Sequence, residues 1–406
     1  MRRVFKGVAW LVIFGVLAIG ILLAALWFEH RAAVALPAPT GSFAVGRATY
    51  VWTDGTPDTL APAPGTNREL LVWMWYPAAA GKSGAMVENY LPAPLRAVVE
   101  GERPALITRF LTRDLSKVHA HSLGNADVAQ PQRPYPVVIF RAGASGEVWN
   151  YSALVEDLAS HGYVVVGFDA PYRTGLVVFP DGRVIRRTPD NNPEFCLPQP
   201  VEERTRCVDR LLAAWNGDLA FVLDRLERLN ASDPSARFTG RLDTTRVGVF
   251  GHSFGGAQAA QFCHDDPRCT AAIDVDGAPV GTVIREGMAK PFMFLLSDHT
   301  SETDPESQQI RSDVRSIYDR VPPDKRLHVV IRGANHFTFS DDGAVLKSRL
   351  LRGVLRAFGR LRIDGRRQLA ITAYCVRTFF DAYLKGTGTP RPEMSSSLYP
   401  EILVLD

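Results

Sequence analysis

The chain has 406 residues, of which 46% are hydrophobic, so it is long enough to bury a full core. Its 46 basic and 43 acidic residues are well mixed along the chain and give a net charge of only +3. This distribution contains no basic stripe and therefore argues against a nucleic-acid-binding role. We expect one large domain, because α/β folds of this size are often single domains with insertions.

The N-terminal segment departs from the average composition. Residues 8–28 carry no charge, whereas Arg2, Arg3 and Lys6 precede them. At about 1.5 Å per residue, a helix of this length matches the hydrocarbon core of a bilayer, about 30 Å thick. The basic flank is expected to stay in the cytoplasm. We therefore expect residues 1–35 to form a membrane anchor and linker, and residues 36–406 to form a domain on the periplasmic or extracellular side.

A cleaved signal peptide is the alternative interpretation of this segment. Ala33-Val34-Ala35 has the small-x-small form of a cleavage site, and cleavage there would leave a secreted chain beginning near Leu36. However, the apolar core of a signal peptide usually runs for about 7 to 15 residues, which is shorter than this one. The length therefore favours a retained anchor.

Two β-like runs follow the linker, over residues 43–52 and 69–76, and we expect them to be the leading antiparallel strands of a sheet. Residues 83–134 have no clear period and are expected to cover a sheet edge or the mouth of a site. From residue 135 the pattern alternates between strands and helices, which predicts a mostly parallel sheet covered on both faces. Strands are expected at 136–140, 163–168, 246–250, 271–275, 291–296 and 327–331, and helices at 152–160, 208–230, 307–318, 345–358 and 367–384. A hairpin is expected around Pro180-Asp181-Gly182, within an insertion at 174–205.

Four of the five cysteines form two local pairs. Cys196 and Cys207 bracket a polar, Pro-containing segment, and Cys263 and Cys269 bracket the loop HDDPR. In an oxidising compartment such pairs indicate disulfides, although spacing alone does not decide the pairing. Cys375 is left as a buried free thiol in LAITAYCV. Since no zinc-type Cys spacing occurs, we expect neither a metal site nor a cofactor.

The hexapeptide GHSFGG places Ser253 between the apolar run RVGVF and the helix-forming stretch AQAAQFC. At a strained strand-to-helix turn, a Cβ at Gly251 or Gly255 would collide with the adjoining strand or helix. The helix would also direct free N–H groups and the positive end of its dipole at the serine. This order is typical of the nucleophile elbow of an α/β-hydrolase, rather than of a Gly-rich turn with a structural serine.

A serine nucleophile needs a base that takes its proton and an acid that orients the base. In this fold the chain order is serine, acid, histidine. The histidines after Ser253 are His264, His299, His328 and His336. We choose His336, because it lies in RGANHFTFSDD just beyond a strand, where catalytic groups collect in open α/β sheets. Asp276 and Asp298 both end strands and remain candidates for the acid, with pattern alone slightly favouring Asp298.

The oxyanion hole of such a site needs two backbone N–H donors. One is expected from Phe254, the residue after the nucleophile. The other is expected from RAGASG, after the strand that ends at Phe140. Ala144 is our choice there, because Gly143 lets the backbone approach closely.

Several segments together resemble the plasma-type platelet-activating factor acetylhydrolase family, whose members are serine esterases of α/β-hydrolase fold. The likeness covers about residues 40–386 and is carried by WYP, YPVVIF, LASHGYVVVGFDAPY, FPDGRV, RVGVFGHSFGG, the segment from DPRC to IDVDG, NHFTFSD and FFDAYLKG. In that family the acid follows the serine by 23 residues, which is the separation of Ser253 and Asp276. The resemblance therefore implies Asp276 as the acid. It does not extend to the oxyanion loop, where the family's His-Gly pair is replaced by Ala142-Gly143.

The resemblance implies a metal-independent serine carboxylic-ester hydrolase that forms an acyl-enzyme. Its substrate would be a short-acyl or oxidised phospholipid or a related lipid ester. Three alternatives stay open: a serine peptidase of the prolyl oligopeptidase type, a polyester- or cutin-degrading esterase, and a catalytically silent anchored binding protein. The peptidase would usually carry a propeller domain, for which too few residues remain. Acyl-chain length, head group and oligomeric state are left open by the sequence.

Overall fold

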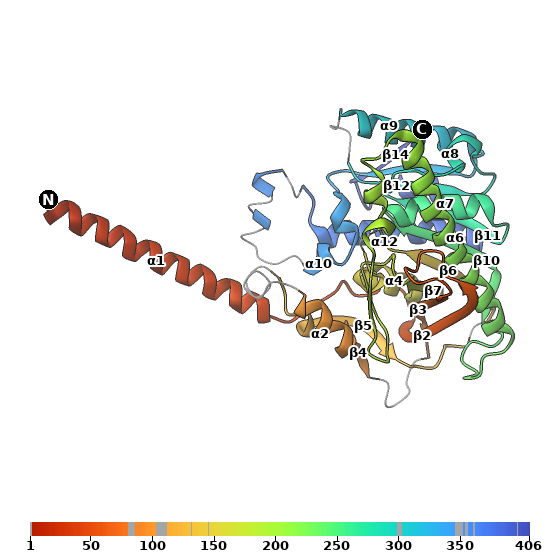
Figure 1. Cartoon of the computed structure of the whole chain (residues 1–406), viewed down its shortest axis with the longest axis horizontal. Helices are drawn as coiled ribbons and strands as arrows, with labels where there is room; N and C mark the ends of the chain where they lie inside the picture. The colour runs from red at the N-terminus through yellow and green to blue at the C-terminus, as the bar shows by residue number, and fades with distance from the viewer. Residues whose placement is uncertain are drawn as a thin grey trace.

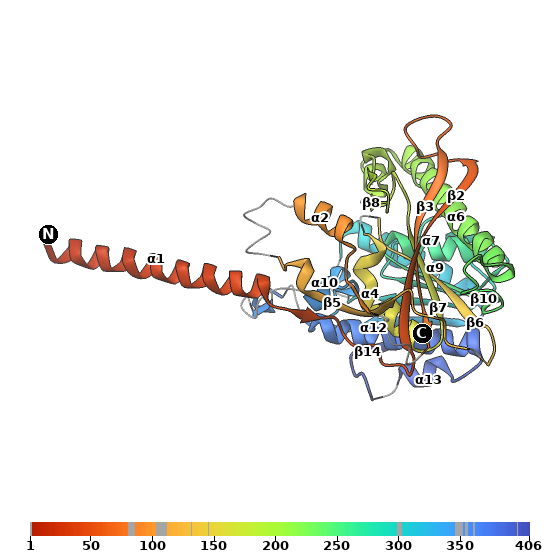
Figure 2. The same cartoon turned by 90° about the horizontal axis from the view of Figure 1, so that it is seen from below.

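The computed structural model describes residues 2–79, 86–102, 112–130, 132–144, 146–298, 303–345, 352–353, 356–359, 362–395 and 397–406. Within these residues, twelve strands form one sheet in the order β1-β5-β2-β3-β7-β6-β10-β11-β12-β13-β14, with β4 paired to β5 (Figures 1 and 2). The strands are β1 Val34–Ala35, β2 Ala44–Pro57, β3 Asn67–Ala78, β4 Val87–Asn89, β5 Val118–Gly124, β6 Tyr135–Arg141, β7 Val164–Asp169, β10 Leu242–His252, β11 Cys269–Val275, β12 Phe292–Leu296, β13 Arg326–Ile331 and β14 Ile402–Leu405. A separate hairpin pairs β8 Leu176–Val178 with β9 Val184–Arg186.

The central strands β7, β6, β10, β11, β12 and β13 run parallel, and β3 and β14 join them antiparallel at either end. The helices are α1 Arg2–Arg31, α2 Ala93–Gly101, α4 Ser152–Ser160, α5 Pro193–Cys196, α6 Val201–Ala231, α7 Phe254–Asp265, α8 Val283–Glu286, α9 Pro305–Arg320, α10 Asp342–Val345, α12 Gly365–Phe380 and α13 Pro390–Met394. The predicted fold class, an α/β-hydrolase with helices on both faces of a mostly parallel sheet, is confirmed.

Side chains of the central strands alternate between two apolar layers, as the period of two in a strand requires. Val138 and Phe140 pack with α4 and α12 on one face. Val137 and Ile139 pack with α6, α7 and α9 on the other. Because both faces are covered, the central strands carry continuous apolar runs, and the carboxyl ends of β10, β11, β12 and β13 meet at one edge of the sheet.

Most of the expected strands and helices are confirmed within a few residues, and the hairpin at residues 180–182 is present as β8 and β9. Residues 118–124, inside the segment without a clear period, form β5, which lies between β1 and β2 near one end of the sheet. Helix α6 begins seven residues before the predicted start, with Glu202 and Glu203 in its first turn, where acidic side chains stabilise a helix. Strand β14 was not predicted, because four apolar residues near the end of the chain carry little periodic signal. Most of the helix expected at 345–358 lies outside the described residues.

Helix α1 projects from the body as a long straight rod (Figures 1 and 2). Among the described residues, Gly7–Arg31 is the one helix long and apolar enough to cross a membrane, and its apolar window is not buried in the protein. Its end contacts the body, since the backbone N–H of Asp114 donates to the carbonyl of His30 at 2.9 Å. After Ala32 and Ala33, β1 pairs with β5.

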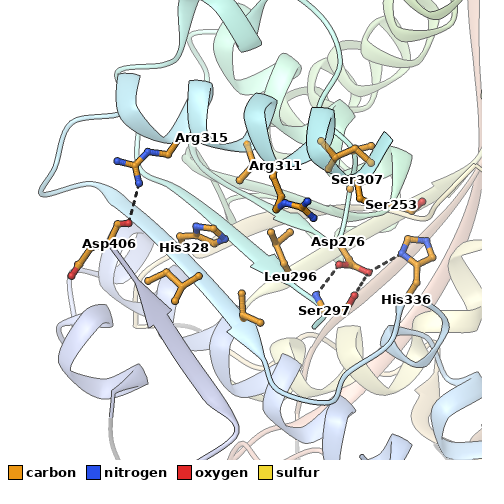
Figure 3. A pocket seen from close by; sticks show the side chains of 16 residues that line it. Ser253, Asp276, Leu296, Ser297, Ser307, Arg311, Arg315, His328, His336 and Asp406 are labelled. Atoms are coloured by element: carbon orange, nitrogen blue, oxygen red, sulfur yellow. Dashed lines mark hydrogen bonds and ion pairs between the residues drawn. The ribbon is translucent and has the colours of Figure 1, made fainter. Parts of the chain in front are cut away.

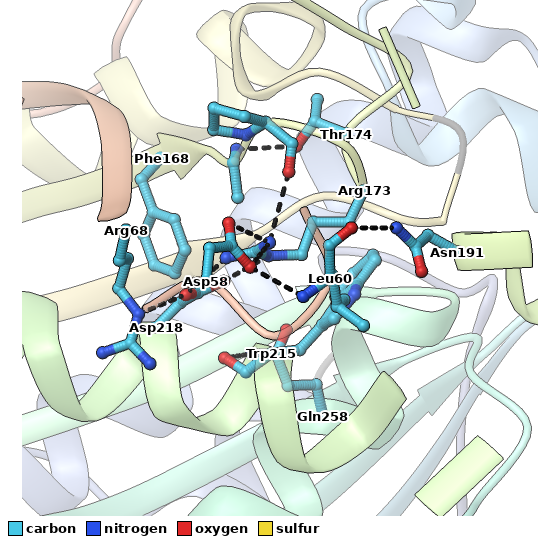
Figure 4. A network of polar contacts seen from close by, with 12 residues as sticks. Asp58, Leu60, Arg68, Phe168, Arg173, Thr174, Asn191, Trp215, Asp218 and Gln258 are labelled. Atoms are coloured by element: carbon cyan, nitrogen blue, oxygen red, sulfur yellow. Dashed lines mark hydrogen bonds and ion pairs between the residues drawn. The ribbon is translucent and has the colours of Figure 1, made fainter. Parts of the chain in front are cut away.

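The two cysteine pairs are present as disulfides, Cys196–Cys207 and Cys263–Cys269, and Cys375 is a buried free thiol. A buried ion-pair network lies under the first hairpin of the sheet. Figure 4 shows the Arg173 guanidinium between Asp58, which follows β2, and Asp218 of α6. This network therefore ties the antiparallel end of the sheet to the long helix.

Candidate active site

Ser253 stands on the turn between β10 and α7, with φ of 58° and ψ of −128°. Its N–H donates to the carbonyl of Val275 at 2.8 Å, which fixes the turn against β11. A Cβ at Gly251 would overlap the Gly255 carbonyl, and one at Gly255 would lie 2.5 Å from the carbonyl oxygen of Ala142. The close approach that the sequence predicted at these glycines is therefore present, and it holds the serine in a conformation that L-residues rarely adopt.

Asp276 is hydrogen-bonded to His336. The Asp276 carboxylate accepts a hydrogen bond from His336 Nδ1 at 2.8 Å, and the Ser297 N–H and hydroxyl donate to it at 2.7 and 2.8 Å. Asp276 follows β11, and His336 begins a short 3₁₀ helix, His336–Phe339, after β13. The strand ends thus bring together two side chains that are 60 residues apart (Figure 3).

Asp298, the alternative acid, is hydrogen-bonded to the backbone of the loop before His336. Its carboxylate accepts the Gly333 N–H at 3.1 Å, and its own N–H donates to the Ala334 carbonyl. These bonds brace the loop that leads to His336. Of the other candidate histidines, His264 contacts Glu286, and His328 lines the cavity described below. His299 is outside the described residues.

His252, the residue before the elbow serine, was missed by the sequence reasoning. Its Nδ1 lies 2.8 Å from the Tyr151 hydroxyl, and its ring lies 4.5 Å from the ring of His336. Burial, together with the nearby His336, lowers the pKa of His252 to about 3, so this imidazole is neutral at neutral pH. Any residue can occupy this position of the G-x-S-x-G motif, so the sequence gave no reason to single out His252.

The loop after β6 passes directly beside the serine, because a Cβ at Gly143 would lie 3.1 Å from the Cβ of Ser253. The Ala144 carbonyl accepts a hydrogen bond from Arg187 Nη1 at 2.6 Å, which the sequence gave no reason to expect. Phe254 is the first residue of α7, where a backbone N–H has no partner within the helix. Phe254 also packs edge-on against Trp215 at 4.8 Å between ring centroids. Of the two expected oxyanion residues, Phe254 therefore follows Ser253 directly, and Ala144 belongs to the loop that passes beside Ser253.

A cavity of about 480 Å³ opens beside this group of residues. Ser253, Asp276 and His336 line one end (Figure 3). Most of its wall is apolar and comes from β12, β13, β14, α9 and the loop after β11: Ala278, Leu296, Ile310, Val314, Val330 and Leu405. His328 lies further along, and burial lowers its pKa to about 4. The cavity is thus a largely apolar space that ends at the serine.

Within the described part of the chain, the His, Cys, Asp and Glu side chains close enough to hold a metal ion are His252, Asp276 and His336. His336 Nδ1 and the Asp276 carboxylate are already bonded to each other. The imidazole Nδ1–H that donates to the carboxylate is the arrangement of a proton-transfer pair.

A mostly parallel sheet, a serine on a strained elbow after its central strand, and an Asp-His pair on later strand ends define an α/β-hydrolase. The chain belongs to the family described as "Platelet-activating factor acetylhydrolase, isoform II", whose model matches residues 29–172 and 200–386.

Two curated relatives and one solved structure are similar to this chain. A "Probable 1-alkyl-2-acetylglycerophosphocholine esterase" of Arthroderma benhamiae is 26% identical over 288 residues, 67% of this chain and 66% of that protein. A "Platelet-activating factor acetylhydrolase" of Cavia porcellus is 28% identical over 229 residues, 51% of this chain and 48% of that protein. The chain thus spans about two thirds and about half of these relatives. The structure of a ferulic acid esterase from Streptomyces cinnamoneus matches 92% of this chain and 100% of its own, with 28% identity and a TM-score of 0.71.

Proposed function

We propose that this protein is a membrane-anchored serine ester hydrolase that acts on short-acyl or oxidised phospholipids or on related lipid esters. One observation carries the proposal: Ser253, held at φ of 58°, lines the same cavity as the hydrogen-bonded pair of Asp276 and His336. The family and the names of the curated relatives support the choice of an ester substrate.

In this proposal, Ser253 Oγ attacks the ester carbonyl while His336 takes its proton, and Asp276 stabilises the imidazolium that forms. The N–H groups of Phe254 and Ala144 bind the oxyanion. The alcohol leaves with the proton from His336, and the acyl group stays on Ser253. His336 then deprotonates a water molecule, whose attack releases the acid and restores the serine.

The anchor is supported by the contacts at the end of α1. The carbonyls of Glu29 and His30 accept hydrogen bonds from Arg113 and from the Asp114 N–H, and β1 pairs with β5. Cleavage before Leu36 would remove all of these contacts. We expect the protein to stay in the membrane pellet after an alkaline wash. A mature N-terminus near Leu36 would contradict a retained anchor.

The test of the activity is an acyl-chain series of soluble esters beside an acetylated phospholipid. Ser253→Ala is the blank, and Ser235→Ala, on the surface turn after α6, is the matched control. The wild type and Ser235→Ala should hydrolyse short-acyl esters and react with a fluorophosphonate probe, whereas Ser253→Ala should do neither. Ester turnover by Ser253→Ala would refute the assignment, and the absence of probe labelling in the wild type would favour a silent binding protein.

The solved structure favours a second candidate within the esterase class, because that protein is a ferulic acid esterase and the cavity wall of this chain is largely apolar. A feruloyl ester and an aliphatic polyester belong in the same series. Faster turnover of either one than of the acetylated phospholipid would move the assignment away from lipid esters. Cleavage of a peptide amide at a comparable rate would indicate a peptidase.

A further inference from the structure

Among the described residues that line the cavity beside Ser253, one cationic side chain, Arg311, has a charge that no hydrogen bond or ion pair engages. Arg311 lines the cavity and comes from α9, whose residues Ser307, Ile310, Arg311 and Val314 all face it. These positions follow the i, i+3, i+4, i+7 spacing of one helix face, so the backbone directs Arg311 to this side. Figure 3 shows its guanidinium reaching into the cavity, on the side of Ser253 and Asp276.

No residue at helical spacing neutralises Arg311. The positions three and four residues away on α9 are Gln308, Val314, Ser307 and Arg315, none of them acidic. Within the described residues, no hydrogen bond or ion pair engages its guanidinium. Two aspartates also line the cavity, and both are engaged: Asp276 is bonded to His336 and Ser297, and the Asp406 carboxylate pairs with Arg391 at 2.7 Å.

The neighbouring arginine is a useful contrast. Arg315 also lines the cavity, but its Nε donates to Asp319 at 2.8 Å and its Nη1 donates to the Asp406 carbonyl at 3.1 Å. Figure 3 shows it turned toward Asp406, away from the serine. His328 is uncharged at neutral pH, because burial holds its pKa near 4. In the described part of the chain, Arg311 is therefore the cationic side chain at the serine end of the cavity that is free to bind a ligand.

We infer that Arg311 is a specificity-determining residue that binds an anionic oxygen group, a carboxylate or a phosphate, of the ester whose carbonyl lies at Ser253. This inference rests on the proposed function and narrows its substrate class to esters with a negative charge in the acid or the alcohol. A planar guanidinium binds such groups through two parallel hydrogen bonds. Beside an apolar wall, water competes less for these bonds than it does on an open surface.

The experiment compares two pairs of esters that differ only in charge. In the first pair the acid differs: the para-nitrophenyl monoester of glutarate against its methyl ester. In the second the alcohol differs: acetylglycerol phosphate against acetylglycerol. For each pair, the readout is the ratio of kcat/KM for the anionic ester to kcat/KM for the neutral ester, in the detergent-solubilised full-length protein at low and high salt.

Arg311→Gln should lower this ratio about tenfold or more in at least one pair, since a hydrogen bond to a charged group contributes that much to binding. Arg311→Lys should keep part of the preference, and high salt should weaken it in the wild type. The matched control is Arg320→Gln, on the same helix but outside the cavity. The pair that responds identifies whether the charge lies in the acid or in the alcohol.

An equal ratio in Arg311→Gln, Arg320→Gln and the wild type for both pairs would overturn the inference while leaving the proposed function intact. If the wild type hydrolyses none of the four esters, the proposed function fails instead. Calorimetric titration with glutarate and with inorganic phosphate keeps the inference testable in that case. Weaker binding of either anion by Arg311→Gln than by Arg320→Gln would support the subsite, and equal binding of both would refute it.

Discussion

Replacing Arg173 by methionine should destabilise the protein strongly, because its charge is buried and fully paired. The side chain is 1% exposed. Its Nη1 lies 2.9 Å from both carboxylate oxygens of Asp58, and its Nε and Nη2 each lie 2.7 Å from Asp218. Removing one partner from a buried ion pair costs about 3–5 kcal/mol, since the carboxylates left behind are poorly solvated.

This free energy converts into a shift of the melting temperature. With an unfolding entropy of about 2.1 cal/mol/K per residue, a domain of roughly 370 residues should lose about 4–6 °C. The assay is thermal unfolding of the detergent-solubilised protein, followed by circular dichroism. The deficit should shrink in Arg173→Met/Asp58→Asn, which removes the carboxylate left without a cation, whereas Asp218 still pairs with Arg68 at 3.2 Å.

Arg183→Met is the matched control for this prediction. Arg183 pairs with Glu69 at 2.7 Å and with Asp181 at 2.7 Å, but its side chain is 48% exposed. An exposed pair contributes only about 0–1 kcal/mol, so its loss should shift the melting temperature by about 1 °C or less. If the melting temperatures of Arg173→Met and Arg183→Met lay within about a degree of each other, burial would not be the reason that the Arg173 network stabilises the protein.

Three further predictions concern the site. Ser297→Ala removes a hydroxyl that donates to Asp276 at 2.8 Å, so kcat/KM for esters should fall about tenfold, and Ser297→Thr should recover most of it. An unchanged rate in Ser297→Ala would mean that the remaining backbone donor suffices. Arg187→Met frees the Ala144 carbonyl and should lower kcat about tenfold with a smaller change in KM, because a loosened oxyanion loop weakens transition-state binding more than substrate binding. Equal effects on both constants would argue against that role. His328 has a pKa lowered to about 4 from 6.5, so the neutral form is favoured in the folded state and stability is lost as the pH falls from 6.5 toward 4. Between pH 7 and pH 4.5, the free energy of unfolding of His328→Phe in urea should therefore fall by about 2–3 kcal/mol less than that of the wild type. Equal decreases in the two proteins would show that His328 does not titrate in this range.

The parts of the fold that could be predicted are those with strong local signals. The continuous apolar runs of β6, β7 and β11, and the GHSFGG turn before α7, each identify a strand or an elbow from a few neighbouring residues. The candidate residues Asp276 and His336 lie at strand ends, so the known order of this fold brought them together.

What could not be predicted depends on contacts between distant segments. His252 contacts the ring of His336 only because the segment after β13 places His336 beside it. Arg187 reaches the Ala144 carbonyl from the insertion, 43 residues away, and Arg311 faces the cavity only because α9 packs along β13. None of these positions carries a local pattern. Pattern alone also favoured Asp298 over Asp276. The family resemblance implied Asp276, which is the aspartate whose carboxylate lies 2.8 Å from His336 Nδ1.

The short junction between α1 and the body has a consequence for where the protein can act. Only Ala32 and Ala33 separate α1 from β1, and the last turn of α1 is hydrogen-bonded to residues 112–114. If α1 spans a bilayer, the body cannot swing away on a flexible tether. Encounters with lipid then become a two-dimensional search within a single membrane, and the effective concentration of substrate is set by the composition of that leaflet rather than by the surrounding solution.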